Sequence, residues 1–209
     1  MKRSLFKAGL WLSLLLSLAG SSAFAQTPSA EEVDARADTA ALGRDLGNPD
    51  PAVRQRAAEA LARLSATDQK KLIEGYYLQE KNKSVRLALE WASYRIGKEE
   101  ALYRIIRDLD SSRHDQAVGY LAQLDTPATL YPFLHRTDNR PKMTVGLLEA
   151  LGRIGVAETR EQIQPFRDSF QEGVSAAAEK ALDEIDARLN EPGLTRPGRP
   201  RTVSKPDQE

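Results

Sequence analysis

Apolar residues recur along the chain with the spacing of an α-helix. In the segment 53–64 (VRQRAAEALARL), the apolar face is carried by Val53, Ala57, Leu61 and Leu64. Steps of four, four and three residues place these side chains on one side of a helix. The same frame returns at four further places: Val85, Leu89, Ser93 and Ile96; Arg113, Ala117, Leu121 and Leu124; Met143, Leu147, Leu151 and Ile154; Val174, Ala178, Leu182 and Ile185. The five frames start 32, 28, 30 and 31 residues apart. One pattern at a nearly constant interval predicts a repeat array.

A second set of helices is predicted between these five. They are expected over about 30–47, 67–80, 99–109, from Pro127 onwards, and 157–170. Together the two sets make about five helix pairs, and no alternating apolar–polar run is long enough to predict a strand. The expected repeats span 30–65, 66–97, 98–125, 126–155 and 156–189.

Several residues predict where these helices start, bend or end. Thr126 before Pro127 is typical of a helix start, and Pro165 predicts a kink. Ser29 with Glu32, and Ser65 with Asp68, resemble capping boxes. Gly97 and Gly155 follow the last apolar residue of their helices, where we expect a left-handed end.

The first repeat also resembles a known family. Asp50-Pro51-Ala52-Val53-Arg54, running into 57–61 (AAEAL), is similar to the turn and second helix of a HEAT repeat, in particular the HEAT-like repeats of phycobilin lyases. That family pairs a turn Asp with the Arg after the Val, here Asp50 and Arg54. The second repeat keeps Val85-Arg86 without the Asp, and the later repeats lose both. The resemblance implies an all-α fold, a right-handed α-solenoid of antiparallel helix pairs with the second helices lining the concave side.

Both ends of the chain differ from the repeats. Residues 1–25 have a basic start (Lys2, Arg3, Lys7), an apolar run over 8–18 and small residues before Gln26. This pattern predicts a bacterial secretory signal peptide and therefore an exported protein, periplasmic or secreted. An uncleaved signal anchor is the alternative. The repeat domain then spans 26–189. Residues 190–209 are rich in Pro, Gly and Arg, which predicts a disordered basic tail.

Composition excludes several kinds of chemistry. The chain has no cysteine, so it forms no disulfides and no thiolate sites. Lys and Arg number 30 against 30 Asp and Glu, which lacks the basic excess of a nucleic-acid binder. The two histidines, His114 and His135, do not have metal-ligand spacing, and no nucleophile or phosphate-loop motif occurs. We therefore expect neither enzymatic activity nor a cofactor or metal.

One face of the second helices is the best candidate for binding. Arg63, Arg95 and Arg153 occupy one repeat position, with Gln123 between them, so they should form a basic ladder. Trp91 and Tyr94 are expected on the exposed side beside Arg95, and Arg86 lies in the turn motif. Trp, Tyr and Arg are enriched at binding hot spots. The alternative is that the arginines are ordinary surface residues and the aromatic pair packs inside.

These features predict a scaffold that binds a protein or peptide partner on the concave face, without nucleic acid. A structural cell-envelope protein, held to a membrane or cell wall by its tail or an uncleaved signal anchor, is the main alternative. A HEAT-like lyase or a small-ligand-binding protein is a further one. Fold resemblance alone does not decide among them.

Overall fold

The computed structural model describes residues 30–190, with side chains from residue 38. Within that range every regular element is helical, which confirms the all-α prediction. The elements are α1 (Ala30–Asp45), α2 (Pro51–Leu64), η1 (Thr67–Gln69), α3 (Lys70–Gln79), α4 (Lys83–Arg95), α5 (Glu100–Asp108), α6 (His114–Leu121), η2 (Pro127–Leu130), α7 (Tyr131–Leu134), α8 (Pro141–Ile154), α9 (Thr159–Ile163), η3 (Gln164–Phe166) and α10 (Val174–Asn190). The expected signal peptide, the tail beyond residue 190 and Ser29 lie outside the described residues.

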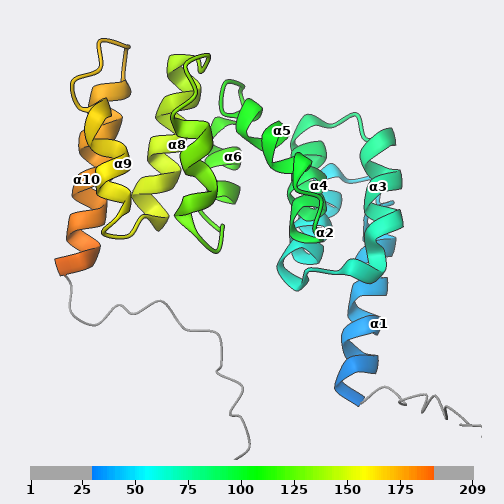
Figure 1. The fold of residues 1–209 in the computed structure, drawn as a ribbon. Coiled ribbons are helices and arrows are strands. Elements are labelled where there is room, and N and C mark those ends of the chain that lie inside the picture. The colour runs from blue at the N-terminus through cyan, green and yellow to red at the C-terminus, as the bar shows by residue number, and fades with distance from the viewer. Residues whose placement is uncertain (1–29, 191–209) are drawn as a thin grey trace, which may run out of the picture.

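The helices pack in two sets. The even-numbered helices contact one another in chain order, α2 on α4, α4 on α6, α6 on α8 and α8 on α10. Each odd-numbered helix packs on the even-numbered helix that follows it. Figure 1 shows the result as a row that runs from α1 and α3 at one end to α10 at the other. A helix pair with two apolar faces buries the second face only against a neighbouring pair.

The core follows the predicted apolar frames. Ala57 and Leu61 of α2 and the frame residues of α4, α8 and α10 are buried, apart from Met143, which is half-buried. The prediction for Leu64 is wrong, because its side chain is 56% exposed. α2 ends at this residue, and Ser65 follows in the left-handed conformation with φ of 49°. The chain therefore turns away before Leu64 can meet a neighbouring helix.

Helix starts and bends were predicted with mixed success. Thr126 does begin a helix, since its Oγ1 accepts a hydrogen bond of 3.3 Å from the amide of Ala128. Pro165 interrupts the predicted helix 157–170, because α9 gives way there to the 3₁₀ helix η3. The capping box at Ser65 and Asp68 is wrong. The Asp68 carboxylate instead accepts a hydrogen bond of 2.7 Å from Thr39 Oγ1 of α1.

The two glycines expected at left-handed helix ends differ. Gly97 has φ of +97°, as predicted. Gly155 has φ of −59°, so that prediction is wrong. A Cβ atom on Gly155 would lie 2.5 Å from the Leu151 carbonyl oxygen and 2.7 Å from Ile185 Cδ1. Glycine is needed there because α10 approaches closely.

The residues that carry the HEAT resemblance hold the first turn in place. Asp50 Oδ1 accepts a hydrogen bond of 2.9 Å from the amide of Ala52, which caps α2. Arg54 makes no hydrogen bond to Asp50; it forms a two-pronged ion pair with Glu80, at 2.7 and 3.0 Å. It also donates to the carbonyl oxygen of Asn48. The Arg54 hydrogen bonds hold the pKa of the nearly buried Glu80 carboxyl below its usual value.

Replacing Glu80 by Gln should lower the free energy of unfolding by about 2 kcal/mol at neutral pH, because a charge-assisted pair is lost. A carboxyl whose pKa is lowered by folding stabilises the protein above its unfolded pKa, and this stabilisation is lost as the pH falls through the folded pKa. The difference between Glu80→Gln and the native chain should therefore shrink below about pH 4.5. Urea denaturation of both chains at pH 7 and pH 3 measures this difference in the free energy of unfolding.

Glu74→Gln is the matched control. Glu74 pairs with Lys98 at 3.3 Å, but both side chains are about one-third exposed. We expect a loss below about 0.5 kcal/mol. A Glu80→Gln effect of equal size at both pH values would show that the ion pair is not its cause.

Candidate functional site

A cleft of about 250 Å³ lies across three successive even-numbered helices. It is lined by Glu59 and Arg63 of α2, Trp91 of α4, Gln116, Gly119 and Tyr120 of α6, and Gln123 just after α6. No single helix pair makes this cleft, because each pair contributes only part of the wall.

The floor of the cleft is an aromatic stack. Trp91 lies against Tyr120, with ring centroids 5.7 Å apart and planes 3° apart, and against Tyr94 at 5.6 Å. The Arg95 guanidinium lies 5.6 Å from the centre of the Trp91 ring, a cation–π contact. The expectation that Trp91 is on the exposed side is wrong, since it is only 2% exposed. The neighbouring rings cover it.

A hydrogen bond crosses above α4 and joins α2 to α6. The Tyr120 hydroxyl donates to Glu59 Oε1 over 2.7 Å and accepts from Gln116 Nε2 over 2.8 Å. Burial raises the pKa of the Tyr120 phenol, so this hydroxyl stays protonated and able to donate. α2 and α6 both flank α4, and their side chains can meet above it only where the surface is concave. The even-numbered helices therefore form a concave surface at this place.

Gly119 keeps the cleft open. It lies within α6, and a Cβ atom built on it would meet nothing within 4 Å. Most residue types at this position would project a side chain into the cleft. Gly75 of α3 is a similar helical glycine outside the cleft, because a Cβ atom built on it would also meet nothing within 4 Å.

The six candidate binding residues divide among three places. Arg63, Trp91, Tyr94 and Arg95 come together at the cleft, where Arg95 also pairs with Asp125 at 3.4 Å. The other two lie elsewhere.

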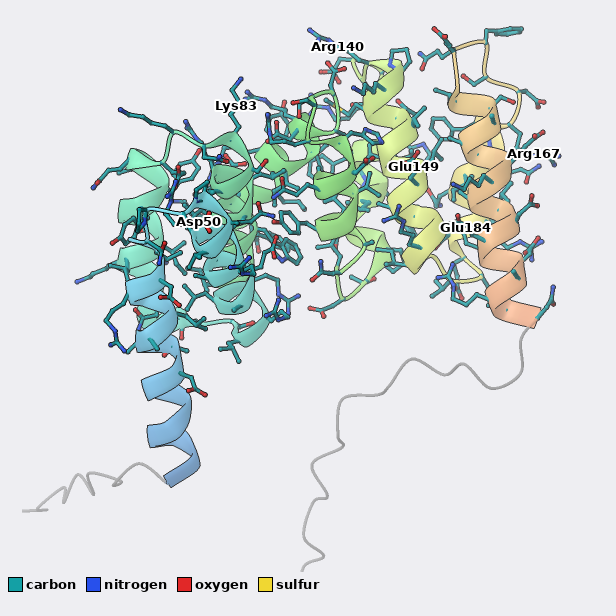
Figure 2. The ribbon with its side chains drawn as sticks, turned by 180° about the vertical axis from the view of Figure 1, so that it is seen from behind. Asp50, Lys83, Arg140, Glu149, Arg167 and Glu184 are labelled. Carbon is teal, nitrogen blue, oxygen red and sulfur yellow. The ribbon has the colours of Figure 1, made fainter. Side chains whose placement is uncertain are left out.

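Arg86 of α4 faces α3, where it donates a hydrogen bond of 3.3 Å to the Tyr77 hydroxyl. Arg153 of α8 lies beside Lys180 and Glu184 of α10 in a small hollow between those two helices. Figure 2 marks this pair of helices by Glu149 and Glu184. The predicted arginine ladder therefore does not converge on one site, because Arg153 lies outside the cleft that Arg63 lines.

Sequence reasoning missed Glu59, Gln116, Gly119 and Tyr120. A signal for two of them was present in the repeat frame. Glu59, Trp91 and Gly119 all stand six residues after the start of their frames, four residues before the arginine ladder position. Two positions four residues apart share one helix face, so the frame could have placed Glu59 and Gly119 beside Arg63 and Trp91. Tyr120 is outside that pattern.

The two histidines have structural partners. His114 Nδ1 donates to the Leu109 carbonyl oxygen over 2.7 Å, and its Nε2 lies 3.0 Å from Glu149 Oε2. His135 Nε2 lies 2.8 Å from Gln162 Oε1. Within the described part of the chain, no three His, Cys, Asp or Glu side chains gather where a metal ion could bind. None of the helices there is both long and apolar enough to cross a membrane.

No protein-family model matches the chain, and no curated protein matches it in sequence.

The buried position of Trp91 predicts that it acts mainly in folding. Trp91→Ala should lower the free energy of unfolding by about 3–5 kcal/mol, because it removes the centre of the aromatic stack. Arg63→Ala, at the exposed rim of the same cleft, should change it by no more than about 0.5 kcal/mol. Urea denaturation of the two variants, monitored by circular dichroism, compares their free energies of unfolding. Equal losses would place the two side chains in similar environments, contrary to the structure.

Proposed function

We propose that this chain is a non-enzymatic, exported HEAT-repeat scaffold that binds a protein or peptide partner in the cleft above Trp91. The observation that carries the proposal is the cleft itself, a concave site assembled from three successive helix pairs. Helical-repeat proteins bind partners on such extended concave surfaces. The right-handed superhelix belongs to this proposal, and so does the assignment to HEAT-like repeats. The packing of each helix on its neighbours in chain order supports the assignment to helical repeats.

The shape and chemistry of the cleft favour an extended peptide segment. A volume of about 250 Å³ admits one or two side chains and not a folded domain. The Trp91 and Tyr120 rings offer an apolar floor, while Arg63 and Gln123 are exposed at the rim. An apolar side chain of the peptide would enter between the two rim residues and rest on the aromatic floor. The rim side chains would hydrogen-bond the peptide backbone. Buried aromatic anchors with a polar rim are the usual arrangement at interfaces.

Export is the second part of the proposal, and it rests on the sequence of residues 1–25. The chain recovered from the periplasm or the medium should begin at Gln26, because the small residues Ala23 and Ala25 mark the cleavage site. Ala25→Arg should block cleavage, whereas Ala30→Arg, five residues further on, should not. N-terminal sequencing of the fractionated protein checks this. Recovery of an uncleaved chain in the membrane fraction would favour a tethered envelope protein instead.

Filling the cleft tests the binding function. Gly119→Trp places a large ring in the cleft from a position where a Cβ atom has no neighbour within 4 Å, so it should abolish partner binding while the helical circular dichroism is retained. Gly75→Trp is the matched control, since that glycine also lies in a helix with open space before it. Tagged full-length chains produced in the native cells and cross-linked before capture would show which partners each variant retains.

The outcomes separate the alternatives. Loss of one protein partner with Gly119→Trp, and its retention with Gly75→Trp, supports the proposal and locates the site. Retention by both variants means that partners bind elsewhere and contradicts the cleft. Failure of the native chain to retain any protein contradicts the scaffold. Co-sedimentation with membranes or cell wall that depends on residues 190–209 would then favour the structural envelope role.

A further inference from the structure

A second and larger cavity, of about 460 Å³, lies on a different side of α4 from the cleft. Both α3 and α5 pack on α4, and the cavity lies between them. Tyr77 of α3 forms one wall, Arg86 and Glu90 of α4 form the floor, and Arg107 of α5 forms the other wall. Figure 2 shows Lys83, another lining residue, at the N-terminal end of α4 on the edge of the molecule.

The lining carries an excess of positive charge. Five cationic side chains face two carboxylates, Glu90 and Asp108, which leaves three positive charges without a counter-charge in the wall. The cations are Lys83, Arg86, Arg104, Arg107 and Arg113. They come from α4, from α5 and from the residue that precedes α6, so the fold gathers them. A chain with equal totals of acidic and basic residues has no such excess on average.

Several of these cations have unused donors. Lys83 and Arg107 are exposed and form no ion pair with any of the described residues. The Nε atoms of Arg104 and Arg113 are buried and have no hydrogen-bond acceptor within the described structure. The Arg104 Nε lies 3.5 Å from Glu90 Oε1, outside hydrogen-bonding geometry. Both Nε atoms are covered by protein, so Lys83 and Arg107 are exposed cations that a ligand could reach.

The other groups of the wall hold the arginines in place. The Tyr77 hydroxyl donates to Glu90 Oε1 over 3.0 Å. The guanidinium groups of Arg86 and Arg104 lie 4.8 and 5.4 Å from the centre of the Tyr77 ring. Glu90, only 6% exposed, anchors this arrangement beneath the cavity. Because the two arginines are already ordered, a ligand would lose little affinity to the cost of ordering them.

We propose that this cavity binds a phosphoryl group carrying two or more negative charges, as part of a soluble phosphorylated compound or of a phospholipid headgroup. Guanidinium groups match the oxygens of phosphoryl groups with paired hydrogen bonds. A single carboxylate, with one charge, would leave most of the positive excess uncompensated. The cavity volume falls in the range of small-molecule sites. This site is separate from the peptide cleft and does not depend on the function proposed for that cleft.

Titration of the full-length chain with inorganic pyrophosphate at fixed ionic strength tests the site. We expect saturable binding of one pyrophosphate, measured by isothermal titration calorimetry. The double variant Lys83→Gln and Arg107→Gln should weaken it at least about tenfold, because two unpaired cations are removed. Both side chains are exposed, so the fold should be unaffected. The control is the double variant Lys71→Gln and Arg167→Gln, which also removes two exposed cations. Lys71 lies in α3, and Arg167, labelled in Figure 2, follows η3. This control should leave the affinity for pyrophosphate unchanged.

Vesicles distinguish the two sources of the phosphoryl group. Co-sedimentation with phosphatidylcholine vesicles that contain phosphatidic acid, lost in the Lys83 and Arg107 double variant, supports a lipid headgroup. Pyrophosphate binding without vesicle binding supports a soluble compound. The proposal is overturned if the native chain does not bind pyrophosphate, or if the control variant weakens binding as much as the cavity variant does.

Discussion

The close stacking of the even-numbered helices is the constraint on which the rest of this structure depends. The chain has no cysteine to link its parts covalently, and each helix pair is too small to enclose a core alone. Small residues let the helices approach. A Cβ atom on Gly152 of α8 would lie 3.1 Å from the Ala181 Cα atom of α10, and one on Gly146 would lie 2.7 Å from Leu109 Cδ2. The contacts that stabilise one pair are therefore made by the next pair along the row.

This stacking also explains why the candidate sites lie around α4. That helix packs on α2, α3, α5 and α6, and eight of its residues are buried. Trp91 on one side forms the floor of the cleft, and Glu90, the residue before it, anchors the arginines of the cavity on another side. Adjacent residues in one rigid helix thus support two surfaces of different chemistry, one aromatic and concave, the other strongly basic. Neither surface exists in an isolated helix pair.

The sequence was sufficient for features that depend on local spacing. The helices expected over 67–80 and 99–109 are found at 67–79 and 100–108, and the frame residues of α4 and α10 are all buried. Features set by distant residues were not predictable. Trp91 is covered by Tyr120, which arrives from another helix pair, so its burial does not follow from the pattern of α4. Gly155 does follow the last residue of α8, but the approach of Ile185, and not a left-handed conformation, explains the glycine. The basic cavity was missed because α5 alone, with Arg104 and Arg107, resembles an ordinary solvated helix.

The aromatic stack has a spectroscopic consequence. Trp91 is the only tryptophan among the described residues, and it lies at the base of the cleft against two tyrosine rings and the Arg95 guanidinium. Indole emission responds to the polarity of its surroundings and to quenching groups in contact with it. With the other tryptophan of the chain, Trp11, confined to the N-terminal segment, the protein contains its own fluorophore at the site of interest. In a chain cleaved at the predicted signal site, Trp91 would be the single tryptophan, and its emission would respond to any change in the packing of the rings at the cleft floor.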